Sequence, residues 1–205
     1  IGVAVVGTGY WGPNLIRNFM ASDRTWLHAV CDLDVERARQ VVGRYTSVRV
    51  TADLAEILAD PHIDAVAIAT PADTHYGIAR ACLEAGKHVL VEKPIALASV
   101  DAERLVGLAA ERGLTLMCDH TFCYTPTVRR IREDVASGAL GRIHYVDSVR
   151  INLGLIQRDA DVFWDLLPHD LSILDSIPPA GIRPVAVSAH GVDPVGAGRA
   201  CVGHV

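Results

Sequence analysis

Three side chains of this sequence, Lys93, Asp165 and His169, carry groups that could hold or move a proton at a substrate oxygen. Lys93 lies in Glu92-Lys93-Pro94, directly after an apolar run with the length of a strand. An ammonium group there could hydrogen-bond a substrate oxygen and stabilise the charge that develops on it. A cis bond before Pro94 would aim Lys93 into a cleft. The alternative is an exposed lysine that only ends a strand.

Asp165 and His169 are four positions apart in a segment, about Asp165 to Ile177, that has the pattern of a helix. With Asp165 as the N-cap, Pro168 falls in the first turn, where its missing N–H costs no hydrogen bond. Residues at this spacing share a helix face, so the carboxylate could orient the imidazole and raise its basicity. This suits a general base that removes a hydroxyl proton. An N-cap beside a half-buried histidine explains the same residues equally well.

A glycine-rich loop follows the first apolar run. It reads G-x-G-x-x-G and consists of Gly7, Thr8, Gly9, Tyr10, Trp11 and Gly12. In this pattern the first glycine permits a tight turn, the second lets the backbone approach a pyrophosphate, and the third lets the helix pack close to the strand. The N-terminus of that helix attracts phosphates. The loop indicates dinucleotide binding, although such a turn alone can be purely structural.

Asp32 strengthens this interpretation, because it lies twenty residues beyond Gly12, at the end of the second predicted strand. A carboxylate there accepts hydrogen bonds from an adenosine ribose and repels a 2′-phosphate. Alternatively, or in addition, Asp32 caps the helix that begins near Val35. Arg37 could lie near the ribose and weaken the preference. We therefore expect NAD as the cofactor, with NADP as the alternative.

The elements that hold these residues follow from the spacing of the apolar runs. Runs with the length of strands alternate with segments of helical period, which predicts parallel strands joined by crossover helices. Strands are expected at Ile1–Val6, Leu27–Cys31, near Val48, Ala65–Ala69, His88–Val91 and Leu114–Met117. Helices are expected to begin near Gly12, Val35, Leu54, Thr74 and Ser99, with Asp53 and Ser99 as capping residues. We thus predict an α/β sheet with helices on both faces over residues 1–120.

The pattern changes after Pro126, and a second, α+β domain is predicted over residues 121–205. Its expected helices are Thr127–Ala136 and Asp165–Ile177, and its expected strands are Arg142–Asn152, Val185–Ala189 and Ala200–Val205. Long strands separated by single helices are typical of an α+β arrangement.

Composition excludes several classes of protein. The 205 residues are 50% hydrophobic and 21% charged, a balance that can bury a core. A net charge of −5 without a basic stripe argues against a nucleic-acid partner. The apolar runs are far shorter than the roughly 18 residues that span a membrane. The five cysteines contain no CxxC pair, so we expect reduced thiols in a cytoplasmic protein and no metal site.

Together, the glycine loop, the Glu-Lys-Pro and the Asp-x-x-x-His resemble the Gfo/Idh/MocA family, named for glucose-fructose oxidoreductase, inositol dehydrogenase and a rhizopine catabolism protein. The resemblance implies a Rossmann domain followed by a domain with a large, mostly antiparallel open sheet. It implies hydride transfer between nicotinamide and a secondary alcohol of a sugar or cyclitol. By position, Lys93, Asp165 and His169 match the family's catalytic residues. Thr70, Pro71 and His75 match its loop near the dinucleotide, where a turn and a helix start are the alternative, and Glu92 accompanies Lys93.

Two segments that border the substrate depart from the best-known members. Many members have Gly-Gly before the catalytic aspartate and Arg-Phe after the sixth strand, where this chain has Phe163-Trp164 and Thr121-Phe122-Cys123-Tyr124. These segments are more similar to members from nucleotide-sugar, surface-polysaccharide or antibiotic-sugar pathways. The substrate contacts expected from this are Tyr124, Arg150, Asn152, Arg158 and Trp164. The arginines would meet a phosphate, unless they are simply solvated. Trp164 would stack on a sugar or base, unless it packs in the core.

We therefore expect an NAD(P)-dependent oxidoreductase that acts on a secondary hydroxyl or ketone of a sugar, in particular a nucleotide sugar. A non-catalytic dinucleotide sensor, a cyclitol dehydrogenase and an imine or aldehyde reductase remain alternatives. The implied open sheet predicts a homo-oligomer. Because such a domain normally extends further in this family, the second domain is expected to be incomplete at Val205.

Overall fold

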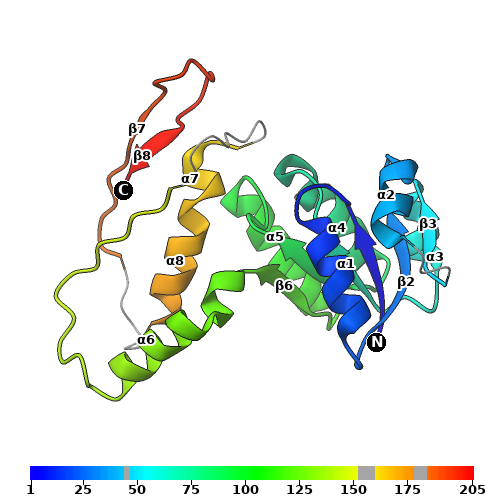
Figure 1. Ribbon diagram of the computed structural model, residues 1–205, viewed down its shortest axis with the longest axis horizontal. Coiled ribbons are helices and arrows are strands. Elements are labelled where there is room, and N and C mark those ends of the chain that lie inside the picture. Colours follow the sequence, from blue (N-terminus) through cyan, green and yellow to red (C-terminus); the bar gives the residue numbers. More distant parts are fainter. Residues whose placement is uncertain (44–46, 152–159, 178–183) are drawn as a thin grey trace. The chain divides into compact units, whose positions relative to one another are not determined.

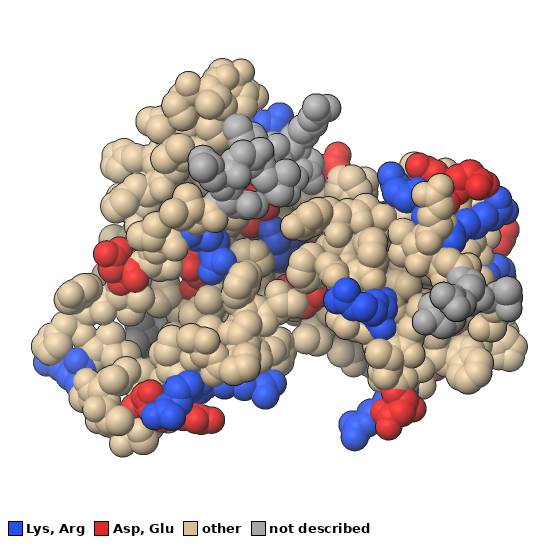
Figure 2. Space-filling model, in the orientation of Figure 1, with Lys and Arg blue, Asp and Glu red and all other residues tan. Residues whose placement is uncertain are grey.

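The computed structural model describes residues 1–43, 47–151, 160–177 and 184–205. The chain divides into two compact units, Ile1–Asp119 and His120–Val205. On the face drawn in Figure 2, acidic and basic side chains are interspersed. None of the helices in the described ranges is both long enough and apolar enough to cross a lipid bilayer.

The first unit is built on a parallel sheet with the strand order β3-β2-β1-β4-β5-β6. Its strands are β1 Gly2–Val6, β2 Trp26–Cys31, β3 Arg49–Thr51, β4 Ala65–Ile68, β5 His88–Glu92 and β6 Leu116–Asp119. The direction of winding reverses between β1 and β4. At such a point the carboxyl ends of the strands leave a crevice in which doubly wound folds bind ligands. The predicted parallel α/β sheet is confirmed.

Helices cover both faces of this sheet, as Figure 1 shows. They are α1 Gly12–Ala21, α2 Val35–Val42, α3 Leu54–Ala59, α4 His75–Glu84 and α5 Ser99–Glu111. The helices α1 and α2 pack with Val5 on one face, and α3, α4 and α5 pack with Ala4 on the other. Neighbouring residues of a strand point to opposite faces, so a strand that is covered on both sides must be apolar throughout.

The helix starts differ in detail from the sequence prediction. Asp53 caps α3 as predicted, since its carboxylate accepts a hydrogen bond from the amide of Ala55 at 2.8 Å. Ser99 does not cap α5: it is already the first helical residue, and Ala98 holds the extended cap position without a side-chain bond. The short 3₁₀ turn Ala72–Thr74 (η1) delays the start of α4 to His75.

Two glycines fix the turn between β1 and α1. Gly7 has a φ of +97°, which favours glycine, and a Cβ there would lie 2.6 Å from the carbonyl oxygen of Ala69, at the end of β4. A Cβ on Gly12 would overlap the carbonyl oxygen of Gly7. These glycines therefore have the roles in turn formation and helix packing that the loop pattern predicts.

The second unit consists of η2 Thr121–Tyr124, α6 Pro126–Ala136, α7 Val162–Asp165, α8 Leu167–Ser176, β7 His190–Val192 and β8 Val202–His204. Its described residues form only one small sheet, the antiparallel pair β7–β8, and not the large open sheet expected. Residues 142–151 form no strand, although their apolar pattern predicts one, because no neighbouring strand in the described ranges bonds to them. The strand expected over Val185–Ala189 lies instead at His190–Val192.

We predict that Gly12→Ala lowers the free energy of unfolding by about 1–3 kcal/mol, because the new methyl group overlaps the Gly7 carbonyl. Gly9→Ala is the matched control in the same loop, since a Cβ there meets no atom within 4 Å. Chemical denaturation of both variants checks this. Equal stability of the two would contradict the packing role assigned to Gly12.

Candidate functional site

The residues expected to bind the cofactor lie at the carboxyl ends of four strands. The glycine loop follows β1, Asp32 follows β2, Thr70 and Pro71 follow β4, and Glu92 is the last residue of β5. Because β2, β1, β4 and β5 are neighbours in a parallel sheet, these ends share one edge. The first unit thus brings its predicted residues together at the crevice.

Asp32 links the glycine loop to β2. The amide and the hydroxyl of Thr8 each donate to Asp32 Oδ2 at 2.6 Å, and the amide of Asp34 donates to Oδ1 at 2.8 Å. Burial works to raise the pKa of Asp32, but the Thr8 hydroxyl, these amides and the charge of Arg37 together lower it. Asp32 is therefore a buried carboxylate that stays charged. It does not cap α2, because Asp34 does so by accepting from the amide of Arg37.

Arg37 reaches this carboxylate from α2. Its Nη2 donates to Asp32 Oδ1 at 2.8 Å, and its Nε lies 3.3 Å from the hydroxyl oxygen of Thr8. The arginine side chain is 47% exposed, whereas that of Asp32 is 6% exposed. Part of the guanidinium is thus bound to Asp32 and Thr8. The remaining part is exposed to solvent and available to bind a phosphate.

The loop leaves space for a pyrophosphate at Gly9. A Cβ on this residue would meet nothing within 4 Å, in contrast to the crowded surroundings of Gly7 and Gly12. The N-terminus of α1, at Gly12, follows three residues later and carries the positive end of the helix dipole. Backbone and helix here fit a dinucleotide phosphate group.

His75 is buried and lies between two backbone carbonyls. Its Nδ1 is 2.7 Å from the oxygen of Pro94, and its Nε2 is 2.8 Å from the oxygen of Thr70. Only 1% of the residue is exposed. His75 therefore joins the loop after β4 to the turn that follows Lys93.

Lys93 begins that turn, and the peptide bond to Pro94 is cis, as the sequence suggests. The residue before it, Glu92, lies opposite Asp119 in the register of β5 and β6, and their carboxyl groups are hydrogen-bonded. Burial, followed by the hydrogen bond with Asp119 and its charge, raises the pKa of Glu92 to about 8. Glu92 therefore keeps its proton to a higher pH than an ordinary glutamate does.

Asp165 and His169 lie on successive helices, not on one. Asp161 caps α7 by accepting from the amides of Phe163 and Trp164, both at 3.0 Å. Asp165 is the last residue of α7, and α8 begins at Leu167 with Pro168 in its first turn. The expected N-cap role of Asp165 is wrong, because Asp165 ends α7, which Asp161 caps, and Leu166 holds the cap position of α8 without a side-chain bond.

Among the substrate residues expected in the second unit, Arg150 makes the most contacts. Its guanidinium binds both carboxylate oxygens of Asp170, and it lies over the ring of Phe122. The Phe122 ring in turn meets the imidazole of His169. Tyr124 and Trp164 are 55% and 39% exposed. Asn152 and Arg158 lie outside the described residues.

Three residues that contact predicted site residues, Asp119, Phe122 and Asp170, are not among the candidates named from the sequence. Asp119 ends a strand at the crevice edge, so its position in the predicted sheet was a usable signal. Phe122 lies in the segment 121–124 that is expected to border the substrate, but its partners, like that of Asp170, come from distant parts of the sequence.

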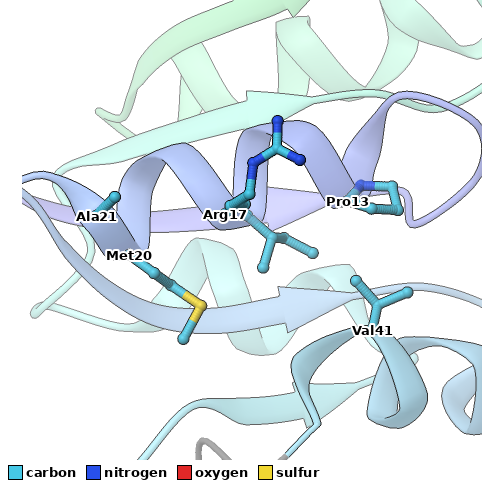
Figure 3. A pocket seen from close by; sticks show the side chains of 6 residues that line it. Pro13, Arg17, Met20, Ala21 and Val41 are labelled. Atoms are coloured by element: carbon cyan, nitrogen blue, oxygen red, sulfur yellow. The ribbon is translucent and has the colours of Figure 1, made fainter.

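A separate pocket lies over α1 and α2. Figure 3 shows Pro13, Arg17, Met20 and Ala21 from α1 and Val41 from α2 around it, and Ile16 completes the lining. None of the predicted site residues lines this pocket.

Comparison with known proteins identifies relatives of this chain. The family model described as an oxidoreductase family with an NAD-binding Rossmann fold, Gfo/Idh/MocA, matches residues 1–120. The UDP-N-acetylglucosamine 3-dehydrogenase of Acidithiobacillus ferrooxidans is 32% identical over 189 residues, which cover 90% of this chain and 58% of that protein.

Two solved structures are similar as well. GenD2 from gentamicin A biosynthesis, in complex with NAD, has a TM-score of 0.76 at 31% identity and covers 86% of this chain and 53% of its own. KijD10, a 3-ketoreductase from Actinomadura kijaniata in complex with NADP and TDP-benzene, has a TM-score of 0.63 at 29% identity and covers 67% and 42%. This chain thus spans about half the length of the relatives that it matches.

The family match extends over the whole parallel sheet of the first unit and includes the glycine loop, Asp32 and Lys93. The more similar relatives extend the likeness into the second unit. The chain therefore belongs to the Gfo/Idh/MocA family of oxidoreductases, which has an NAD-binding Rossmann fold.

Proposed function

We propose that this protein is an NAD(P)-dependent oxidoreductase that transfers hydride between nicotinamide and the secondary hydroxyl or ketone of a sugar, in particular a nucleotide sugar. The observation that carries the proposal is the charged Asp32, bound by Thr8 and Arg37 at the crevice of the sheet. Similarity to a UDP-N-acetylglucosamine dehydrogenase and to a ketoreductase solved with TDP-benzene supports the substrate class.

The first unit supplies the dinucleotide site in this proposal. The amides of the glycine loop and of α1 bind the pyrophosphate at the space beside Gly9. Asp32 accepts hydrogen bonds from the ribose, and Arg37 binds a 2′-phosphate when NADP replaces NAD. Further contacts come from Thr8, Tyr10, Trp11, Thr70, Pro71 and Glu92. His75 acts indirectly, because it is buried and holds the loops on which Thr70 and Lys93 lie.

The chemistry assigns one role to each of three side chains. Bound nicotinamide supplies the hydride acceptor or donor. In the oxidative direction, His169 takes the hydroxyl proton while Lys93 hydrogen-bonds the oxygen and stabilises its growing charge. Asp165 adds a negative charge that favours the imidazolium formed. In the reductive direction, the same groups return the proton to the new hydroxyl.

Substrate binding is proposed for residues 121–205 and cofactor binding for residues 1–120. Tyr124 and Trp164 present large exposed ring surfaces, which suit stacking on a sugar or base. Asn152 and Arg158 are further candidates for substrate contacts. Arg150 is less suited to bind a phosphate directly, because its guanidinium already binds Asp170.

We also infer a cytoplasmic homo-oligomer. Tyr145, Val149 and Ile151 are 84%, 81% and 81% exposed, on a segment whose alternating pattern is typical of a strand. A sheet that covers these side chains in a neighbouring copy would remove apolar surface from water. Light scattering on the purified protein distinguishes an oligomer from a monomer.

The catalytic assignment predicts that Lys93→Ala and His169→Ala each lower turnover by about 10²-fold or more, because each removes a group that acts on the reacting oxygen. NAD affinity should stay unchanged in both variants. Formation of reduced nicotinamide from NAD and UDP-N-acetylglucosamine, or the nucleotide sugar that reacts best, gives the turnover. The exposed His144→Ala serves as the control. Wild-type turnover in both variants would refute the assignment, and cofactor binding without any turnover would favour a sensor.

The cofactor assignment predicts that Arg37→Ala weakens NADP binding by about tenfold, because a charge-assisted hydrogen bond to the 2′-phosphate is lost. NAD binding should change little. Titration calorimetry with both dinucleotides measures this, and Arg39→Ala, an exposed arginine on the same helix, is the control. Equal loss of NAD and NADP affinity would mean that Arg37 only supports the fold around Asp32.

A further inference from the structure

Arg150 and Asp170 form a well-packed ion pair in the second unit. The Nε of Arg150 donates to Asp170 Oδ2 at 2.8 Å and its Nη2 donates to Oδ1 at 3.1 Å, while the hydroxyl of Ser148 donates to Oδ1 at 2.8 Å. The two charged side chains are 21% and 16% exposed. This two-point geometry restricts both partners far more than a single contact between exposed side chains does.

Arg150 also contacts Phe122, the residue whose ring packs against His169, the proposed base. Its guanidinium carbon lies 4.5 Å from the centroid of the Phe122 ring, a cation–π arrangement. The ring of Phe122 packs against the imidazole of His169 in a T-shaped contact, with centroids 4.7 Å apart and an interplanar angle of 71°. Because Asp170 directly follows His169 on α8, the contacts close a ring from His169 through Phe122 and Arg150 to Asp170.

We propose that Arg150 and Asp170 are positioning residues for His169. They hold Phe122 against the imidazole, and they balance each other's charge beside it. The proposal rests on the proposed function, in which His169 is the base. Arg150 alone would place a positive charge near the site where an imidazolium must form. Asp170 cancels that charge, and its own pKa is lowered, first by the hydrogen bonds from Arg150.

Several ionisable groups lie on α8 and on the elements around it, so a test must change only the groups it concerns. Those on α8, and on the elements that pack against it, are Asp161, Asp165, Asp170, Asp175, His120, Cys123, Tyr124, Asp147 and Arg150. The proposal concerns only the two that form the bidentate pair. Because these two carry opposite charges, removing one or the other must change the proton affinity of His169 in opposite directions.

The test is an NMR titration of the histidine side chains in the whole protein, which contains nine histidines. The signal of His169 is identified by its loss in His169→Ala. Arg150→Met leaves Asp170 unbalanced and should raise the pKa of His169 by roughly one unit, whereas Asp170→Asn leaves Arg150 unbalanced and should lower it by a similar amount. The double variant should return close to wild type.

Matched variants separate this effect from general damage to the fold. Arg130→Met and Asp134→Asn remove an exposed pair on α6, with side chains 72% and 30% exposed, and should leave His169 unchanged. Arg150→Lys keeps the charge but loses the bidentate contact, so it should keep the pKa and lower turnover. The signals of the other histidines report whether each variant is folded. If Arg150→Met does not fold, Asp170→Asn and Arg150→Lys decide the question.

Shifts of equal sign in Arg150→Met and Asp170→Asn, or no shift in either, would overturn the proposal. So would wild-type turnover in Arg150→Lys. The titration needs no substrate, so its outcome is independent of the proposed function. That function fails instead if His169→Ala keeps its turnover, whatever the titration shows.

Discussion

The crevice at the carboxyl edge of the parallel sheet depends on the carboxylate of Asp32. Two donors of Thr8, the amide of Asp34 and the guanidinium of Arg37 all bind it, so one buried charge holds the glycine loop, the end of β2 and the start of α2. A carboxylate at this depth is stable only when its oxygens are hydrogen-bonded. The Asp32 carboxylate, which could accept hydrogen bonds from a ribose, therefore also holds the surrounding segments in place.

The first unit could be predicted from the sequence for a physical reason. Its central strands β1 and β4 are covered on both faces and are uninterrupted apolar runs, and the helices beside the sheet have apolar stripes. The glycine loop was equally predictable, because only glycine fits at Gly7 and Gly12. What failed was the choice of capping residues: Leu166 rather than Asp165 holds the cap position of α8, and Ala98 rather than Ser99 holds that of α5. That choice depends on backbone angles that the sequence pattern does not encode.

The second unit was less predictable because its contacts are between distant segments. The apolar alternation over 142–151 predicts a strand, but a strand needs a neighbour, and none bonds to it in the described ranges. The sequence makes Arg150 a candidate for binding a phosphate, but its guanidinium is already paired with Asp170. Phe122 lies in a segment expected to border the substrate, but its contacts with the imidazole of His169 and the guanidinium of Arg150 could not be predicted from that segment.

In the proposed function, the dinucleotide held at Asp32 exchanges hydride with a nucleotide sugar. The most direct measurement is a screen of nucleotide sugars, free sugars and cyclitols with NAD and NADP, in both oxidation states, which follows the absorbance of the reduced nicotinamide. We expect turnover with at least one nucleotide sugar, faster than with any free sugar or cyclitol. Tight cofactor binding with no absorbance change for any nucleotide sugar would contradict it.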